Sequence, residues 1–198
     1  MVENLGIPGR EMGVRPDHEQ ESRMAHVLIA GLPGTGKTDF SHWLHTTHGY
    51  VHIEVDTALE SDAAVQLLLH RDVFNVLSVA ESLKARGPDV VLDWGFVPSL
   101  LGRVRQLIRT GFEPWWFTGD EDAARQSFLA NGVAPERLFD LQLADIHASW
   151  PRIEKVFDSR ILNVLGSNPD GFACLSPEEI LETMGERQPD GFPAASTT

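Results

Sequence analysis

The sequence contains a single cysteine, Cys174, and has no long apolar segment. One cysteine cannot form an internal disulfide, which agrees with a reducing cytosol. No apolar run approaches the roughly 18 residues of a membrane span, and the N-terminus lacks the apolar core of a signal peptide. We therefore predict a cytoplasmic protein that does not associate with a membrane.

Lysine and arginine are scarce, with 16 basic residues against 29 acidic residues and a formal net charge of −13. This excess of negative charge disfavours a general affinity for nucleic acid or anionic lipid, because both are polyanions. It does not exclude a local basic pocket. The charge therefore points away from nucleic acid as a partner.

The chain of 198 residues has the length of one ordinary domain, and 42% of its residues are hydrophobic. Residues 1–23 are rich in glycine, proline and charge without sustained periodicity, which predicts a flexible N-terminal extension. Residues 186–198 predict a flexible tail, so 24–185 is the expected folded domain. Met24 stands directly before the first predicted strand, so an upstream extension and a start codon assigned too early are both open.

A complete phosphate-binding motif lies in the segment from His26 to Phe40. Residues Gly31–Thr38 read GLPGTGKT and fit the pattern G-x-x-x-x-G-K-[ST] without a mismatch. An apolar run precedes the motif and helix-compatible sequence follows it, which disfavours a chance match by a glycine-rich turn. The glycines allow successive amides to face phosphate oxygens, and the helix N-terminus favours the same anion. We expect Lys37 to reach the β- and γ-phosphates and Thr38 to ligate Mg²⁺.

Strand and helix patterns alternate along the rest of the chain, which predicts an α/β fold. Apolar runs predict five strands, over Val27–Ala30, Tyr50–Val55, Asp89–Leu92, Glu113–Thr118 and Arg160–Leu165. Periodic stripes predict helices over Thr38–Thr47, Ser61–Ala85, Pro98–Thr110, Asp120–Ala130, from Glu136 with a kink or split at Pro151, and from Ser176. This alternation implies three layers, with a five-stranded parallel sheet covered on both faces.

Two aspartates stand at predicted strand ends, where parallel sheets line their ligand crevices. Asp56 follows the second strand and should face the phosphate site, although a carboxylate there is also common as a helix cap. Asp93 ends the run VVLD at the position of a Walker B aspartate, which holds Mg²⁺, although a strand-end turn is the plain alternative. Trp94 follows in place of the glutamate that activates water in motor ATPases, which favours transfer to a bound acceptor.

The order of these segments resembles the P-loop kinase group. HVLIAGLPGTGKT is followed by HIEVD after one helix and by VVLDWGF after a longer one. The pattern is similar to shikimate, gluconate and adenylate kinases and chloramphenicol phosphotransferase. It especially resembles small ATP-binding proteins labelled as AAA-type kinases, several of which carry a DWGF-like segment. The likeness covers Met24 to Gly185 and implies the strand order 2-3-1-4-5, with ATP and Mg²⁺ as ligands.

The resemblance also implies roles for particular side chains. Asp56 would bind the acceptor hydroxyl and take its proton, and Arg125 would be the first arginine of a mobile lid. A second lid arginine is expected near Asn131 and is missing, so Arg137 could substitute. The remaining arginine candidates are Arg152 for the lid, and Arg103 and Arg105 for the substrate.

The resemblance places the adenine beside the segment that follows the fifth strand, Gly166, Ser167 and Asn168. Trp94 and Phe96 could stack on a planar substrate, but aromatic residues near a strand end more often belong to the core. The predicted nucleotide-binding residues are Gly31, Leu32, Pro33, Gly34, Thr35, Gly36, Lys37, Thr38, Asp39 and Gly166. The predicted catalytic residues are Lys37, Asp56 and Arg125, and the predicted metal ligands are Thr38 and Asp93.

The sequence therefore predicts an ATP-dependent phosphotransferase that acts on an unidentified small molecule, as a monomer or a homodimer. The alternative is a nucleotide-binding regulatory protein or a weak ATPase without a dedicated acceptor. A GTPase is disfavoured because no N-K-x-D guanine motif is present. A full AAA+ motor would need a longer chain and the missing glutamate.

Overall fold

The computed structural model describes residues 25–58, 61–69, 76–95, 98–132, 135–168 and 171–186. The predicted extension over 1–23 and residues 187–198 of the predicted tail lie outside the described residues; Glu186 is described and ends the last helix. Among the residues that the structure describes, no helix combines the length and the apolar character that a membrane span requires.

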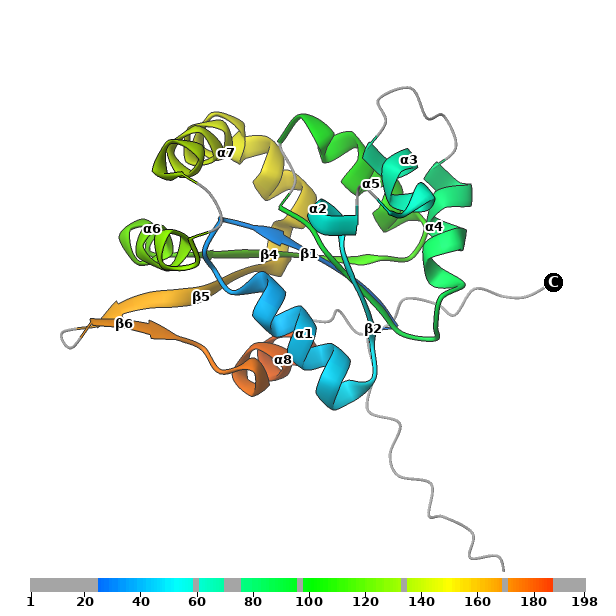
Figure 1. Cartoon of the computed structure of the whole chain (residues 1–198), viewed down its shortest axis with the longest axis horizontal. Coiled ribbons are helices and arrows are strands. Elements are labelled where there is room, and N and C mark those ends of the chain that lie inside the picture. Colours follow the sequence, from blue (N-terminus) through cyan, green and yellow to red (C-terminus); the bar gives the residue numbers. More distant parts are fainter. Residues whose placement is uncertain are drawn as a thin grey trace, which may run out of the picture.

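A single mixed sheet forms the centre of the molecule (Figure 1). Its strands are β1 His26–Gly31, β2 Val51–Glu54, β3 Val90–Asp93, β4 Glu113–Gly119, β5 Ile161–Asn168 and β6 Gly171–Cys174. The strand order is β2-β3-β1-β4-β5-β6, and the first five strands are parallel. The predicted order 2-3-1-4-5 is therefore confirmed.

The sixth strand corrects the prediction of a five-stranded sheet. β6 is antiparallel to β5, with Gly166 paired with Ala173 and Asn168 paired with Gly171. The fifth strand was expected to stop at Leu165, because the polar and glycine residues that follow it are typical of a loop. In the structure those residues continue β5, since β6 satisfies their backbone hydrogen-bonding groups.

Helices cover both faces of the sheet (Figure 1). Helices α1 Lys37–His48 and α8 Pro177–Glu186 lie on one face. The opposite face carries α4 Val76–Lys84, α5 Leu101–Arg109 and α7 Glu136–Phe157. The remaining elements are the helices α2 Val55–Ala58, α3 Ala63–Leu69 and α6 Glu121–Ala130 and the 3₁₀ turns η1 Pro98–Leu100 and η2 Asp158–Arg160.

The core runs through the middle strands, which explains their uninterrupted apolar sequences. All four residues of β3 are buried, and Val27, Leu28, Ile29 and Ala30 of β1 have no exposed surface. A parallel strand with helices on both faces has no solvated side, so apolar residues occupy successive positions. Trp94, which is 1% exposed, belongs to this core and is not free to stack on a substrate. Phe96 lies outside the described residues.

Two helix predictions need correction. The single helix expected over Ser61–Ala85 is two helices, α3 and α4, which pack against each other. Val65 and Leu68 of α3 are buried, as are Val76, Val79, Ala80 and Leu83 of α4. Of the two outcomes expected at Pro151, a kink or a split, the structure excludes the split, since α7 continues through this residue. Pro151 is exposed, so water can satisfy the carbonyl that its missing N–H leaves unpaired.

The predicted capped start of the last helix is confirmed. The amide of Glu179 donates to Ser176 Oγ at 3.2 Å, and the amide of Ser176 donates to Glu179 Oε2 at 2.7 Å. This reciprocal pair satisfies two backbone donors at the start of α8.

Candidate active site

The phosphate loop connects β1 to α1, and two of its glycines are required by close backbone contacts. A Cβ on Gly31 would collide with the carbonyl oxygen of Phe117 in β4, and one on Gly34 would collide with that of Ala124 in α6. Gly31, Gly34 and Gly36 also have positive φ angles of 149°, 78° and 74°. The loop thus takes its path because three positions lack side chains.

Side chains of the loop hold it closed on the carbonyl oxygen of Leu32. Thr35 Oγ1 donates to this oxygen at 2.7 Å, and Lys37 Nζ donates to it at 2.9 Å. Thr35 is only 2% exposed, so its hydroxyl serves the loop and not a ligand at the surface. Lys37 stands at the start of α1, where unpaired backbone amides favour an anion.

The Lys37 ammonium is partly buried beside two carboxylates. Burial lowers the pKa of Lys37, while the negative charges of Asp93 and Asp56 oppose that shift. An ammonium taken out of water loses hydration, which an anionic ligand in contact with it can replace. The loop therefore presents a partly dehydrated cation at the place where the sequence predicts phosphate binding.

Asp56 lies in the first turn of α2, directly after β2. Its Oδ2 accepts a hydrogen bond from the amide of Gly95 at 3.0 Å, which fixes the carboxylate against the segment that follows β3. A Cβ on Gly95 would lie 2.9 Å from that oxygen, so the contact needs a glycine. Burial is the largest influence on Asp56 and raises its pKa, while the hydrogen bond from Gly95 acts in the opposite direction.

Asp93 ends β3 and is 3% exposed. Its Oδ2 has no hydrogen-bond partner among the described residues, and His52 Nε2 lies 3.8 Å away, too far for a hydrogen bond. An unpaired buried carboxylate oxygen is costly, and a metal ion or its bound water would satisfy it. Asp93 and the Thr38 hydroxyl are oxygen ligands of the kind that Mg²⁺ prefers, so these residues fit the predicted ion.

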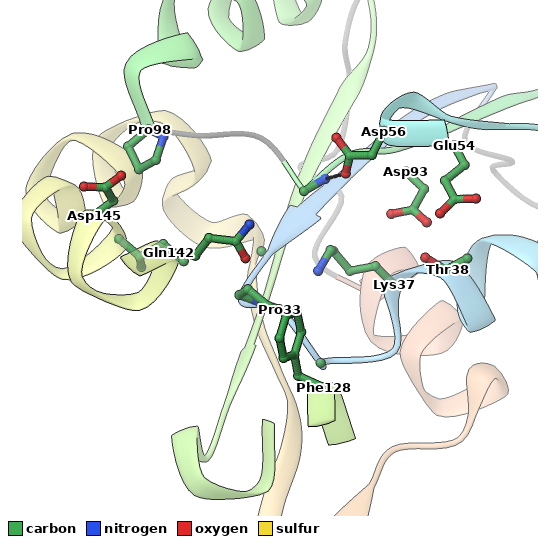
Figure 2. A pocket seen from close by; sticks show the side chains of 14 residues that line it. Pro33, Lys37, Thr38, Glu54, Asp56, Asp93, Pro98, Phe128, Gln142 and Asp145 are labelled. Carbon is green, nitrogen blue, oxygen red and sulfur yellow. Dashed lines mark hydrogen bonds between the residues drawn. The ribbon is translucent and has the colours of Figure 1, made fainter. Parts of the chain in front are cut away.

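These side chains meet at one cavity of about 210 Å³ (Figure 2). The loop, the β2–α2 junction, β3 and its following segment form one side of it, while α6, α7 and η1 form the other. Its described lining residues are Gly31, Pro33, Gly34, Lys37, Thr38, Glu54, Asp56, Asp93, Gly95, Pro98, Phe128, Gln142, Asp145 and Ile146. The fold therefore brings Lys37, Thr38, Asp56 and Asp93 together, as the sequence analysis expected of strand ends in a parallel sheet.

Other predicted nucleotide-binding residues are not among the described residues that line the cavity. Leu32 and Thr35 are buried inside the loop, and Asp39 is exposed on α1. Gly166 lies within β5 and not in a loop, and it is not one of the described lining residues of the cavity.

Arg125 is held away from the cavity by α7. Its Nη1 lies 2.6 Å from Asp140 Oδ1 and 3.2 Å from Glu136 Oε1, and its guanidinium stacks on Phe139 at 4.8 Å from the ring centroid. Of the other arginine candidates, Arg152 donates to Ser149 and Arg103 donates to Gln106, while Arg105 and Arg137 are exposed. None of these arginines is among the described residues that line the cavity.

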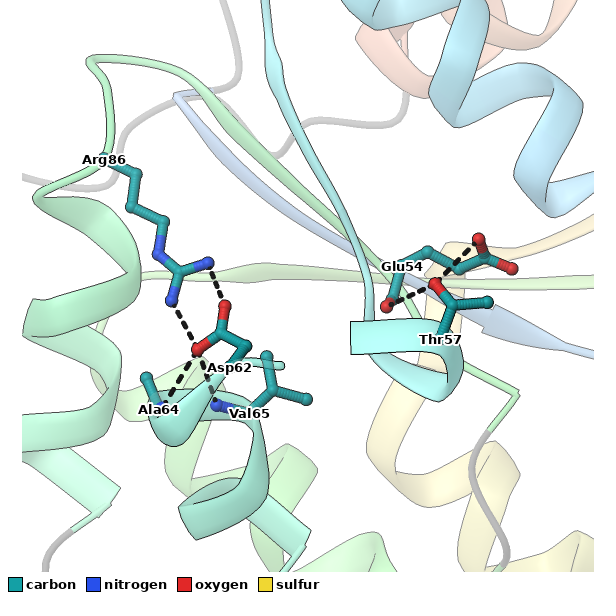
Figure 3. A network of polar contacts seen from close by, with 6 residues as sticks. All are labelled: Glu54, Thr57, Asp62, Ala64, Val65 and Arg86. Atoms are coloured by element: carbon teal, nitrogen blue, oxygen red, sulfur yellow. Dashed lines mark hydrogen bonds and ion pairs between the residues drawn. The ribbon is translucent and has the colours of Figure 1, made fainter. Parts of the chain in front are cut away.

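Several cavity residues were missed by sequence reasoning. Glu54 stands two residues before Asp56, and a strand has a period of two, so its position could have been inferred. Thr57 Oγ1 donates to Glu54 Oε2 at 3.0 Å (Figure 3), and Figure 2 shows the Glu54 carboxylate near Asp93. Gln142, Asp145 and Ile146 have the spacing of one helix face, but no sequence signal separates a cavity face from a solvated one.

Fold and site together define a class. The parallel order β2-β3-β1-β4-β5, with the phosphate loop between β1 and α1, is the P-loop kinase fold. A gluconokinase from Sinorhizobium meliloti 1021 shares it at 18% identity and a TM-score of 0.50, over 82% of this chain and 92% of its own. A shikimate kinase from Bacteroides thetaiotaomicron shares it at 16% identity and a TM-score of 0.50, over 83% and 96%. No protein-family model and no curated protein matches the chain.

Proposed function

We propose that this protein is an ATP-dependent kinase that transfers the γ-phosphoryl group of MgATP to a hydroxyl group of a small molecule. One observation carries the proposal: the cavity joins a phosphate loop to two strand-end carboxylates and extends beyond them to α7. The loop accounts for the nucleotide, and the space beside Asp56 accounts for an acceptor.

The loop and the start of α1 would bind the triphosphate. Lys37 would exchange its hydrogen bond to the Leu32 carbonyl for hydrogen bonds to phosphate oxygens. Backbone amides of the loop would also donate to these oxygens. The remaining predicted nucleotide contacts, Asp39 and Gly166, stay part of the proposal. Thr38, Asp93 and the newly found Glu54 would hold Mg²⁺ directly or through water, and the ion would neutralise charge on the β- and γ-phosphates.

Asp56 would act on the acceptor. Its carboxylate would accept the hydroxyl proton while the acceptor oxygen bonds to the γ-phosphorus and the bond from that phosphorus to the β–γ bridging oxygen breaks, releasing ADP. The raised pKa makes Asp56 a stronger base than an ordinary carboxylate, which suits this role. The amide of Gly95 would hold the carboxylate in place throughout.

Arg125 would need a conformational change before it could stabilise the transferring group. It would have to leave Asp140 and Glu136, a step that closure of α6 over the nucleotide could provide. The ion pairs of Arg125 with α7 favour the second candidate function, a nucleotide-binding protein that turns over slowly without an acceptor.

The decisive experiment measures ADP release by the purified full chain with MgATP, alone and with a library of metabolites, nucleosides and antibiotics. A kinase should respond to a restricted group of hydroxyl compounds, and Lys37→Ala should abolish the response. ADP release that no acceptor changes, with tight MgATP binding, would support the regulatory alternative.

A further inference from the structure

The described lining of the cavity as a whole is strongly acidic. Among the described residues that line the cavity, four carry carboxylates, Glu54, Asp56, Asp93 and Asp145, and one carries an ammonium, Lys37. Lys37 lies on the phosphate loop and donates to its Leu32 carbonyl. Once a nucleotide engages that ammonium, no described lining residue offers a positive charge to the acceptor.

The wall formed by α7 is placed to select the acceptor. Gln142 points from α7 toward the centre of the cavity, while the exposed carboxylate of Asp145 lies beside Pro98, farther from Lys37 and Thr38 (Figure 2). Gln142 offers an amide that both donates and accepts, whereas Asp145 only accepts when ionised. A carboxylate on the acceptor would meet this carboxylate without a compensating cation, and an ammonium would be attracted to it.

Two of the four carboxylates belong to the proposed metal site. Asp93 Oδ2 lines the cavity and has no hydrogen-bond partner among the described residues. A Mg²⁺ ion held by Asp93 and Glu54 would offset their charges, which leaves Asp56 and Asp145 as the negative groups that face an acceptor.

We propose that the acceptor is a hydroxylated amine that is cationic at neutral pH, with its ammonium group on the Asp145 side of the cavity and its hydroxyl group at Asp56. This inference rests on the proposed kinase function. The chemistry is that of phosphoryl transfer to the hydroxyl oxygen, and the amine is not phosphorylated. Asp145 is thereby a specificity-determining residue, and hydroxy acids are excluded by repulsion.

Two matched series of probes test the charge preference: serinol, glycerol and glycerate, and glucosamine, glucose and gluconate. Each is titrated by calorimetry into the full chain saturated with Mg²⁺ and a non-hydrolysable ATP analogue, and each is assayed for acceptor-dependent ADP release. We expect the amine of at least one series to exceed its hydroxy acid by about tenfold or more in affinity or turnover.

Asp145→Lys should reverse that ranking, and Asp145→Asn should weaken it, while both keep MgATP affinity. Glu154→Lys is the matched control, because it replaces a negative charge by a positive one just as Asp145→Lys does. Glu154 lies on the exposed surface of α7 and is not among the described residues that line the cavity. It should leave the ranking unchanged.

Three results would overturn the proposal. They are a preference for the neutral or anionic probe, a ranking that Asp145→Lys leaves unchanged, and failure of both amines to bind and to raise ADP release. The kinase assignment is judged separately. If glycerol, glucose or a hydroxy acid raises ADP release more than the matching amine does, the protein is a kinase whose acceptor class was inferred wrongly. If the whole library is inert, the proposed kinase function fails as well.

Discussion

Lys37 shows how a partly buried charge prepares a site for its ligand. Its ammonium is partly dehydrated, which lowers its pKa, and it donates a hydrogen bond to a carbonyl of its own loop. A carbonyl dipole compensates an ammonium less well than an anion does. Phosphate binding should therefore replace a modest interaction with a stronger one.

Lys37→Ala should weaken MgATP binding by about 10- to 100-fold, because it removes a hydrogen-bonding cation from the phosphates. The variant should remain folded, since the loop keeps the Thr35 bond to Leu32. Calorimetric titration with MgATP, beside circular dichroism, measures both. Unchanged affinity would contradict the phosphate-site assignment.

The two aspartates should separate acceptor chemistry from nucleotide binding. Asp56→Asn should keep MgATP affinity and reduce acceptor-dependent transfer by about 100-fold or more, because the base is lost. Asp93→Asn should weaken the Mg²⁺-dependent part of binding and reduce transfer and background hydrolysis together. Affinity by calorimetry and turnover by ADP release test the pair, and full transfer in Asp56→Asn would remove Asp56 from the mechanism.

Gly95 controls the position of Asp56, and its replacement can be matched to another glycine. Gly95→Ala would place a Cβ 2.9 Å from Asp56 Oδ2, which should displace the carboxylate and reduce transfer by up to about 100-fold. Gly102→Ala on α5 is the control, because a Cβ there meets nothing within 4 Å. It should instead raise the free energy of unfolding by about 0.5–1 kcal/mol and leave turnover unchanged. Equal turnover in both variants would show that Asp56 does not depend on this contact.

At the scale of elements, Asp62 links two helices. Its Oδ1 accepts from the amides of Ala64 and Val65 at 3.0 and 3.2 Å, which caps α3 (Figure 3). Arg86, just after α4, donates to the same carboxylate, with Nη2 2.8 Å from Oδ1. The hydrogen bond from Arg86 is the largest influence on Asp62 and lowers its pKa. One side chain thus fixes the start of α3 to the end of α4.

Asp62→Ala should lower the free energy of unfolding by about 1–2 kcal/mol, the usual cost of a lost cap. Because the folded-state pKa of Asp62 is depressed, its contribution is present above the unfolded-state pKa and is lost as the pH falls through the folded-state value. Urea unfolding at neutral and acidic pH should therefore show a difference from wild type that shrinks in acid. Arg86→Ala should retain the cap and lose only the ion pair, so it should lower the free energy of unfolding by less than Asp62→Ala does. An equal loss in the two variants would contradict the separate contribution of the cap.

The sequence was informative about elements where a local rule decides the outcome. Glycine spacing predicted the phosphate loop, apolar runs predicted the five parallel strands, and Ser176 with Glu179 predicted the start of α8. It failed where tertiary pairing decides. The residues of β6 have weak strand character and become a strand by pairing with β5, and the break between α3 and α4 lets those helices pack together.

The candidate site divides in the same way. Lys37, Thr38, Asp56 and Asp93 follow strands, and the geometry of a parallel sheet gathers strand ends at one edge. Gln142 and Asp145 come from the middle of a long helix, where polar residues look the same whether they face solvent or a cavity. Their position depends on how α7 packs over the sheet, which no local pattern encodes.

At the scale of the whole molecule, nucleotide binding should be visible as thermal stabilisation. A ligand that binds only the folded state at about 100 times its Kd adds about 2.7 kcal/mol, which should raise the Tm by about 5–10 °C for a domain of this size. The shift should require both ATP and Mg²⁺ and should shrink in Lys37→Ala. Differential scanning fluorimetry with ATP in EDTA as the control measures it, and an equal shift without Mg²⁺ would argue against the metal site.

The contact between Gly34 and α6 also restricts how this protein can change over generations. The missing Cβ at position 34 is what permits the Ala124 carbonyl to approach the loop. A lineage that acquired any side chain there would have to shift α6 outward, and with it Arg125 and Phe128, which lie on the same helix. Mutational drift in α6 and in the loop is therefore not independent. Laboratory selection for a new acceptor should therefore yield substitutions in α7, while Gly34 and the backbone of α6 stay unchanged.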